Sequence, residues 1–245
     1  MDSEIRQMVL SVIIPAYNEQ DTIYRVLERV SAIELIRGTG KELVIVNDAS
    51  ADGTESEIIR FRKEHPDTLL SYQKHEKNQG KGAALRTGIR SAGGDLIVVQ
   101  DADLEYDPRE INLLLEPVLD GFADVVYGSR FVGSRPHRVL FYFHSVGNRF
   151  LTSLSNLFTN INITDMESGY KLFKSEIIKK IRLVENRFGF EAEVTAKVSR
   201  IPHVRIYEVG ISYYGRTYRE GKKVNWRDGF RAIYCVIKYN IFCRK

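Results

Sequence analysis

Two carboxylates, Asp101 and Asp103, stand one residue apart shortly after the apolar run 96–99, with only Gln100 between. The run is short and mostly β-branched, which predicts a strand buried on both faces. Two negative charges at the end of such a strand are costly unless a positive group meets them. Carboxylate oxygens suit Mg²⁺ or Mn²⁺ carrying a diphosphate. The pair therefore indicates a metal-assisted phosphate site, and the plainer alternative is that both residues only cap a turn or the next helix.

Alternating strands and helices must position this pair. The segments between the apolar runs have helical spacing, and in the first of them Asn18 is the expected N-cap, with Glu19 in the first turn. Strands separated by helices of about ten residues predict βαβ units and a largely parallel sheet. Ligands bind at the carboxyl ends of the strands in such sheets. The predicted strands lie near 9–15, 43–46, 69–73, 96–99 and 123–127.

The second half of the chain has a different character. Residues 131–162 are rich in aromatic and polar side chains and include an amphipathic stretch over 140–157. Residues 201–214 alternate like a β-hairpin with Gly210 near its turn, and a basic loop follows at 215–228. With no internal repeat or low-complexity linker, we expect one domain over 1–245 with an elaborated C-terminal half.

The composition excludes several classes of protein. Hydrophobic residues make up 43% and charged residues 28%, which is ordinary for a soluble globule. The net charge of +4 fits anionic ligands or a membrane surface and is too weak to indicate nucleic acid. Cys235 and Cys243 have no His or Cys partner beside them, so we expect free thiols. No apolar run reaches about 18 residues and no signal peptide is evident, so we expect a cytoplasmic protein without a transmembrane segment.

Five segments, in this order, carry a resemblance to a known family. They are 12–19 (VIIPAYNE), 46–54 (VNDASADGT), 80–84 (GKGAA), 101–105 (DADLE) and 128–131 (GSRF). They resemble family 2 glycosyltransferases, and within them the polyprenyl-phosphate (dolichol-phosphate) mannosyl- and glucosyltransferase branch. The resemblance implies a GT-A fold, a Rossmann-like nucleotide-binding α/β sandwich with a mostly parallel central sheet. It implies a nucleotide-sugar part over about 8–131 and an acceptor-side part over about 132–245.

The resemblance also implies roles at the donor site. Asp48 corresponds to the carboxylate that accepts a hydrogen bond from the nucleotide base, although Asn47 stands where an Asp is usual. Lys81 lies at a predicted helix N-terminus, where amides and the helix dipole favour anions, and the alternative is a solvated lysine. The implied nucleotide-binding residues are Pro15, Tyr17, Glu19, Asp48, Lys81, Asp101 and Ala102. The implied ligands of Mg²⁺ or Mn²⁺ are Asp101, Asp103 and Glu105.

The reaction implied is a single displacement that inverts the anomeric carbon while the metal neutralises charge on the diphosphate leaving group. A lipid monophosphate acceptor is already anionic near neutral pH, because its second pKa is about 6. It therefore requires cations rather than a general base. We expect Arg130 and Arg216 to be catalytic together with Asp103. The candidate cations for the acceptor phosphate are Arg130, Arg138, Arg216, Arg219, Lys222 and Lys223.

A saccharide hydroxyl acceptor would instead need a general base, and Glu191 is the candidate. The neighbouring Glu193 is expected to be an exposed helical acid, and segment 164–171 resembles a branch motif near the acceptor or sugar pocket. We expect transfer of a hexose from GDP-mannose or UDP-glucose to a dolichyl or undecaprenyl phosphate. The alternatives are a glycan acceptor with the same donor chemistry and a non-catalytic nucleotide-sugar-binding protein.

The final segment, 226–245, predicts a basic amphipathic helix that bears on location. The apolar stripe along this helix is compatible either with contact to an anionic membrane surface or with packing against the protein core. The aromatic segment 140–143 is a second candidate for lipid contact. We expect the protein at the inner face of the membrane, held by peripheral contact or by a membrane-anchored partner. The apolar stripe of the helix is Trp226, Phe230, Ile233, Ile237 and Ile241.

Overall fold

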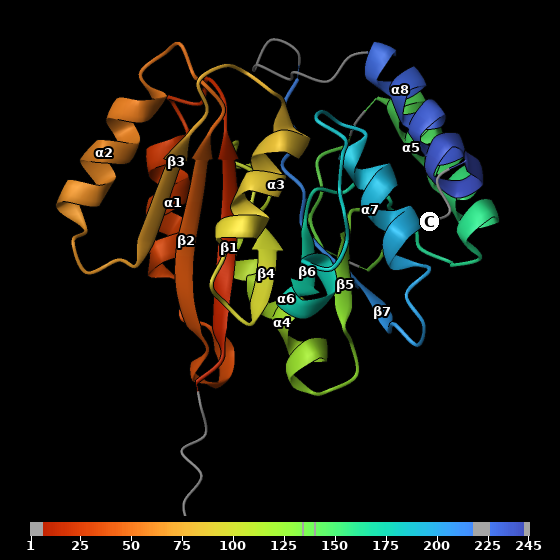
Figure 1. Cartoon of the computed structure of the whole chain (residues 1–245), viewed down its shortest axis with the longest axis horizontal. Helices are drawn as coiled ribbons and strands as arrows, with labels where there is room; N and C mark the ends of the chain where they lie inside the picture. The colour runs from red at the N-terminus through yellow and green to blue at the C-terminus, as the bar shows by residue number, and fades with distance from the viewer. Residues whose placement is uncertain (1–6, 134, 140, 218–225, 243–245) are drawn as a thin grey trace, which may run out of the picture.

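A seven-stranded sheet forms the centre of the computed structural model, which describes residues 7–133, 135–139, 141–217 and 226–242 (Figure 1). The strand order is β3-β2-β1-β4-β6-β5-β7, and only β6 runs antiparallel to its neighbours. The strands are β1 (Val9–Ala16), β2 (Gly40–Asn47), β3 (Leu70–Lys74), β4 (Leu96–Val99), β5 (Val125–Ser129), β6 (Lys171–Lys174) and β7 (Ile206–Gly210).

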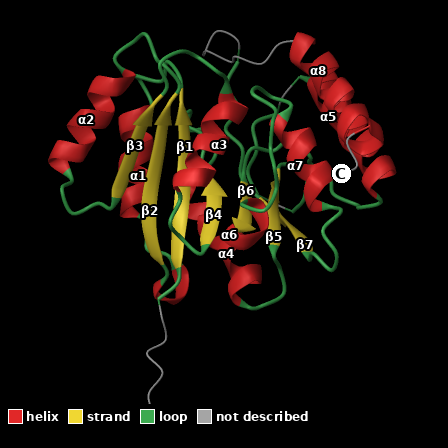
Figure 2. Cartoon of the chain, viewed as in Figure 1, coloured by secondary structure: helices red, strands yellow, loops and turns green. Residues whose placement is uncertain are grey.

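Helices cover both faces of this sheet (Figure 2). One face packs against α1 (Ile23–Ala32), α2 (Thr54–Glu64) and α4 (Ile111–Leu119). The other packs against α3 (Lys81–Ser91), α5 (Tyr142–Thr159), α7 (Phe190–Val198) and α8 (Trp226–Ile237). Shorter pieces are α6 (Ser175–Ile178), the 3₁₀ turns Ile36–Gly38 and Pro108–Glu110, and a π-helical turn, Lys238–Phe242, after α8.

Burial on both faces explains the continuous apolar runs of the inner strands. In β1, Val12 and Ile14 pack with one group of helices, whereas Ile13 packs with the other. Every residue of β4 is at most 2% exposed. Successive side chains of a strand point to opposite faces, so a strand covered on both sides is apolar at every position. The predicted α/β class with a mostly parallel sheet is confirmed.

The predicted hairpin over 201–214 is wrong. Only β7 forms there, at the edge of the sheet, and it pairs in parallel with β5. Gly210 does not make a turn, because it is the last residue of β7. A Cβ at this position would collide with the carbonyl oxygen of Val132. The glycine therefore permits a close approach of two backbone segments, which a sequence pattern cannot distinguish from a turn.

Asn18 is not the N-cap of the first helix, and this prediction is also wrong. Thr22 occupies that position, so Glu19 lies in the preceding loop. Asn18 adopts a φ of 51°, and its Oδ1 accepts a hydrogen bond from the Ala51 amide at 2.9 Å. The side chain thus joins the loop after β1 to the loop after β2.

Helix α8 packs on α5 and α7 through a face that overlaps the predicted stripe only in part, because Ile233 packs against the core. Its buried side chains include Cys235, a free thiol, and Val236, whereas Phe230 and Ile241 of the predicted stripe are exposed. Cys243 and the side chain of Trp226 lie outside the described residues. Among the described helices, none combines the length and apolar character needed to cross a membrane.

Candidate active site

The carboxyl ends of β1, β2, β4 and β5 meet at the upper edge of the sheet in Figure 1. The loops that follow these strands carry most of the predicted site residues. Because β6 runs the other way, segment 164–170 before it arrives at the same edge. Partly exposed Pro15 lies near the end of β1, exposed Tyr17 follows that strand, and buried Ala102 follows β4. This is the ligand-binding edge expected for a mostly parallel sheet.

Asp48 is buried beneath the loop that leads into α3. Its Oδ1 accepts a hydrogen bond from the Gln79 amide at 2.9 Å and lies 2.7 Å from His75 Nδ1. Its Oδ2 accepts a hydrogen bond from the Gly80 amide at 2.6 Å. Asp48 therefore positions the N-terminus of α3. Beside it, a cavity of about 460 Å³ is lined by Ala49, Ser50, Lys74, His75 and Glu76.

Asn47, which stands where the family usually has Asp, is fully buried. Its Nδ2 donates to the Tyr72 hydroxyl at 3.1 Å, and its Oδ1 accepts from the Ser50 amide at 2.9 Å. The Tyr72 hydroxyl already donates its hydrogen to Glu55 Oε1 at 3.0 Å, so an ionised carboxylate, which has no hydrogen to donate, could not replace the first contact. The neutral side-chain amide of Asn47 therefore makes both hydrogen bonds without burying a second charge beside Asp48.

Lys81 lies in the first turn of α3 and is paired with carboxylates rather than solvated. Its Nζ is 2.8 Å from Asp101 Oδ1 and 3.6 Å from Glu191 Oε1. Burial alone would lower the pKa of Lys81, but the charges of Asp101 and Glu191 outweigh it and raise the pKa. Lys81 therefore places a fixed positive charge at a helix N-terminus, beside one of the three predicted metal ligands.

Asp103 and Glu105 flank Leu104, whose φ of 60° marks a tight turn. Arg216 lies against this turn, with Nη2 at 3.0 Å from Asp103 Oδ2 and Nε at 3.4 Å from Glu105 Oε1. Tyr213 donates its hydroxyl to the other oxygen of Glu105 at 2.8 Å. Burial, followed by the charges of Asp101 and Glu105, raises the pKa of Asp103 to about 7 despite Arg216. The turn is an acidic position that favours a cation.

This donor set fits a divalent metal that is shared with a substrate. Within the described ranges, no three His, Cys, Asp or Glu side chains are arranged to hold a metal ion by themselves. Mg²⁺ is commonly bound by one or two carboxylates while substrate phosphates and waters supply the other oxygens. Asp101 and Asp103 supply such a pair at the edge of the sheet. The oxygens of Glu105 are engaged here by Arg216 and Tyr213.

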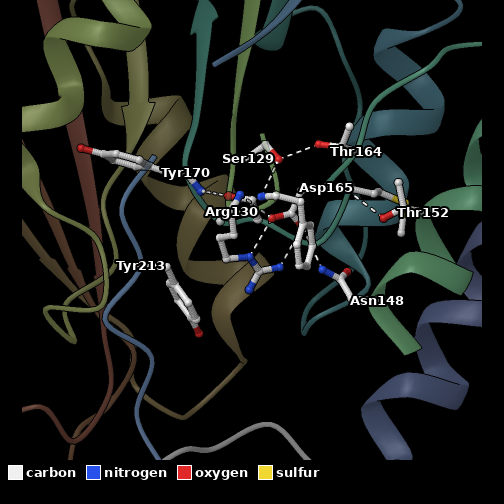
Figure 3. A network of polar contacts seen from close by, with 12 residues as sticks. Ser129, Arg130, Asn148, Thr152, Thr164, Asp165, Tyr170 and Tyr213 are labelled. Carbon is white, nitrogen blue, oxygen red and sulfur yellow. Dashed lines mark hydrogen bonds and ion pairs between the residues drawn. The ribbon is translucent and has the colours of Figure 1, made fainter. Parts of the chain in front are cut away.

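Arg130, directly after β5, is held by a buried carboxylate (Figure 3). Its Nε and Nη2 donate to the two oxygens of Asp165 at 2.7 and 2.8 Å, and Asn148 Nδ2 donates to Asp165 at 3.0 Å. The guanidinium also lies over the ring of Tyr213, 5.1 Å from its centroid. Burial alone would raise the pKa of Asp165, but the charge and hydrogen bonds of Arg130 lower it. Asp165 therefore remains a charged partner that fixes the arginine.

Glu191 lies in the first turn of α7 and is 4% exposed. The prediction that Glu193 is an exposed acid is wrong, because its side chain is fully buried. Glu193 accepts hydrogen bonds from the amides of Val184 and Glu185 and pairs with Lys197 Nζ at 2.6 Å. The reason is that α7 is covered on nearly all sides, so a position that reads as a polar helix face lies in the interior.

The other cations predicted to bind the acceptor phosphate either have a different contact or lie outside the described residues. Arg138 is exposed and donates from Nη1 to the Gly215 carbonyl at 2.8 Å. Arg219, Lys222 and Lys223 lie outside the described residues. Sequence reasoning missed His75, Asn148 and Tyr213, because none of them stands in a motif and each reaches the site only through the fold.

Comparisons with known proteins agree with this architecture. The family model for glycosyl transferase family 2 matches residues 11–182. Dolichyl-phosphate beta-glucosyltransferase of Trichomonas vaginalis is 33% identical, over 96% of this chain and 74% of its own length. Dolichol-phosphate mannosyltransferase of Pyrococcus furiosus is 29% identical over 95% of this chain, which spans 64% of that relative.

The fold is shared with a solved structure of low sequence identity. Glucosyl-3-phosphoglycerate synthase of Mycobacterium tuberculosis, solved with Mn²⁺, UDP and glucosyl-3-phosphoglycerate, superposes with a TM-score of 0.73. It is 20% identical, and the match covers 95% of this chain and 80% of that one. The present chain belongs to glycosyl transferase family 2, and its fold is the GT-A fold that was predicted. The predicted class, a nucleotide-sugar-dependent glycosyltransferase, is likewise confirmed.

Proposed function

We propose that this protein is a metal-dependent inverting glycosyltransferase that moves a hexose from GDP-mannose or UDP-glucose to a polyprenyl phosphate. The observation that carries the proposal is the alternation of charge at one sheet edge. Asp101 pairs with Lys81 and Asp103 with Arg216, and Arg130, which Asp165 holds, follows β5 at the same edge. Such an edge can receive a metal-bound diphosphate and a second phosphate together.

On the donor side, the nucleoside occupies the edge formed by the loops after β1 and β2, within the 8–131 part. The cavity beside Asp48 and the exposed ring of Tyr17 support this placement. Asp101 and Asp103 would hold the metal, Mg²⁺ or Mn²⁺, which neutralises charge on the departing diphosphate. Lys81 adds a positive charge at the N-terminus of α3. The structure of a related fold with Mn²⁺ and UDP is compatible with this donor chemistry.

On the acceptor side, Arg130, which lies just before the 132–245 part, holds the lipid phosphate. Its Nε and Nη2 are engaged by Asp165, and within the described residues Nη1 makes no hydrogen bond. A preoriented guanidinium binds phosphate with little further loss of side-chain freedom. An anionic phosphate needs no general base, since its oxygen is already the nucleophile. Two relatives are named for dolichol- or dolichyl-phosphate, which supports this class of acceptor.

An exposed apolar surface on α5 and α8 supports contact with a membrane. Along α5, Phe143, Val146, Phe150 and Leu157 are exposed at intervals that place them on one side of the helix. On the adjacent α8 and the turn after it, Phe230, Tyr234, Ile241 and Phe242 are exposed. We call these eight residues the aromatic surface. Exposed apolar area of this kind marks an interaction site.

The aromatic surface is connected to the acceptor cation. Asn148 of α5 donates to Asp165, the residue that holds Arg130. A lipid whose chain enters beside α5 therefore brings its phosphate toward Arg130. Exposed Arg138 and Arg149 add positive charge near the same helix, which favours anionic lipid. We infer peripheral attachment at the inner face of the cell membrane.

The test is a transfer assay with radiolabelled sugar. Purified protein, Mn²⁺ or Mg²⁺, and GDP-mannose or UDP-glucose are mixed with a short-chain polyprenyl phosphate. The expected result is metal-dependent label in the organic phase that is absent with Asp103→Ala. Donor binding without any lipid labelling would reject the lipid acceptor.

A saccharide acceptor is the second candidate, and one observation favours it. Glu191 Oε2 is buried without a hydrogen-bond partner, as a general base awaiting a hydroxyl would be. In that case Glu191→Gln abolishes transfer to a glycan while Arg130→Ala has little effect. Dependence on Arg130 and tolerance of Glu191→Gln would select the lipid phosphate.

A further inference from the structure

The segment 185–187, which leads into α7, lies directly against the first turn of α3. A Cβ at either Gly80 or Gly82 would collide with carbonyl oxygens of this segment. The amide of Ala83 donates a hydrogen bond to one of them, the carbonyl oxygen of Asn186, at 3.1 Å. Because backbone meets backbone here, no flexible side chain absorbs a shift of the segment. The position of the segment therefore sets the position of the helix N-terminus.

Arg86 of α3 makes a second connection to the same segment. Its Nη1 donates to the carbonyl oxygen of Glu185, and its Nη2 donates to the side-chain Oδ1 of Asn186 at 2.6 Å. The donors of a guanidinium have a fixed geometry, so two such bonds define both distance and orientation. The segment and the helix are thus joined at Ala83 and again one turn further along α3.

The side chain of Glu185 connects the segment to α8. It is buried, and its carboxylate accepts three hydrogen bonds, from Arg231 Nη2 at 2.7 Å, Lys238 Nζ at 2.9 Å and the Tyr239 hydroxyl at 2.6 Å. Arg231 belongs to α8, and the other two donors belong to the turn after it. Hydrogen bonds between charged groups are short and strong. Glu185 therefore has its backbone on α3 and its side chain held by α8.

The first turn of α3 is the part of the donor site that these contacts place. Lys81 stands between the two glycines that have no space toward segment 185–187, and its Nζ lies 2.8 Å from Asp101 Oδ1. A helix N-terminus with a lysine is suited to bind phosphate. Small displacements of such a group are costly, because phosphate binding depends on correctly placed donors.

We propose that Glu185 is a positioning residue for the donor diphosphate: through its contacts with α8 it holds segment 185–187 against α3 and thereby places Lys81. This inference rests on the proposed function. Glu185 acts through Lys81 and does not itself contact the donor. Helix α8, which lies more than 120 residues after the donor carboxylates in the sequence, therefore contributes to donor binding.

The test is a double-mutant cycle on nucleotide affinity. Isothermal titration calorimetry with Mn²⁺ uses UDP or GDP, whichever binds the wild-type protein. Glu185→Gln should weaken binding of the diphosphate about 3- to 30-fold, the range typical of residues that act on a site through others. In the Lys81→Ala background the same substitution should change the affinity less than about 2-fold, because the group that Glu185 positions is gone.

Asp124→Asn is the matched control. Asp124 is 9% exposed and pairs with Lys174 and Arg205 just before β5, at the opposite end of the sheet. Its substitution also removes an ion-paired carboxylate, so it should lower the melting temperature while leaving the affinity unchanged. Equal losses of affinity from Glu185→Gln in the two Lys81 backgrounds would overturn the positioning role and leave the proposed function intact. Binding of neither UDP nor GDP to the wild-type protein would overturn the proposed function and this inference with it.

Arg86→Ala tests the same segment without touching α8, which matters if Glu185→Gln does not fold. It should weaken diphosphate binding in the same way, and only while Lys81 is present. Arg90→Ala removes an exposed arginine one turn further along α3 and should leave the affinity unchanged. An unchanged affinity in either folded variant, Glu185→Gln or Arg86→Ala, would overturn the proposal.

Discussion

Arg216 Nη2 lies 3.0 Å from Asp103 Oδ2, although the two residues are 113 positions apart in the sequence. The guanidinium also contacts Glu105 and Glu19, so it supplies positive charge to the acidic turn after β4. The same cation is a candidate for binding the acceptor phosphate. Arg216 therefore has two alternative anionic partners, the carboxylates of the turn and an incoming phosphate.

Arg216→Ala should bind Mn²⁺ more tightly in the absence of nucleotide, by about 5- to 10-fold, because a partly buried ion pair no longer competes with the metal. Transfer activity should fall at the same time, since a phosphate ligand is lost. Electron paramagnetic resonance of free Mn²⁺ measures the first effect. Arg216→Lys keeps the charge and should stay near the wild type, and weaker Mn²⁺ binding by the alanine variant would contradict this account.

Asp165→Asn should destabilise the protein by about 3–5 kcal/mol, because removing one partner leaves the mostly buried charge of Arg130 uncompensated. Urea unfolding measures this loss. Asn148→Ala removes only one hydrogen bond to the same carboxylate and should cost about 1 kcal/mol. Equal losses of unfolding free energy in the two variants would show that the ion pair of Asp165 with Arg130 stabilises the fold no more than the single hydrogen bond from Asn148 does.

Phe143→Ser and Phe230→Ser should each weaken binding to vesicles that contain phosphatidylglycerol by about 10-fold, the value expected for an aromatic side chain that enters lipid. Co-sedimentation measures the binding, and thermal unfolding should be unchanged because both residues are exposed. Phe122→Ser is the control, since Phe122 is exposed but lies outside the aromatic surface. If the control loses as much binding, the aromatic surface does not contact the membrane.

Glu185 ties α8 to the rest of the molecule in a pH-dependent way. Burial alone would raise its pKa, but hydrogen bonds from Arg231, Tyr239 and Lys238 outweigh it and lower the pKa from 4.5 to about 2. The stabilisation is therefore complete above pH 4.5 and is lost as the pH falls toward 2.

Glu185→Gln should accordingly lower the melting temperature at pH 7 and then lose less stability than the wild type between pH 5 and pH 3. Circular dichroism melts at these three pH values measure the difference. Glu176→Gln, at an exposed position of α6, controls for loss of a carboxylate. Parallel pH profiles of the wild type and the Glu185 variant would rule out this linkage.

Local signals predicted the first five strands and the position of Asp101 and Asp103 after the fourth of them. The run 96–99 and the pair Asp101 and Asp103 are adjacent in sequence, so burial on both faces and a strand end could be read directly. Contacts between residues that are distant in sequence could not be predicted. Neither the contact of Arg216 with Asp103 nor that of Arg130 with Asp165 has a local pattern, because each depends on which strands become neighbours.

Faces of helices were the other source of error. In the predicted stripe of α8, Ile233 packs on the core but Phe230 and Ile241 are exposed, so periodicity alone did not identify the face that packs. Glu193 illustrates the converse case, in which an acidic residue is buried because backbone amides of a neighbouring segment bind it. Both outcomes were decided by tertiary packing rather than by local sequence.

The position of β6 limits how this protein can be divided. The strand comes from the part of the chain after residue 131, yet it lies between β4 and β5 of the part before it and pairs with both. A fragment that ends near residue 131 would therefore leave two apolar strands with unpaired backbone edges where a single continuous sheet had been. Such open edges promote aggregation. The segments before and after residue 131 therefore fold as one cooperative unit, and neither can be exchanged as a separate domain.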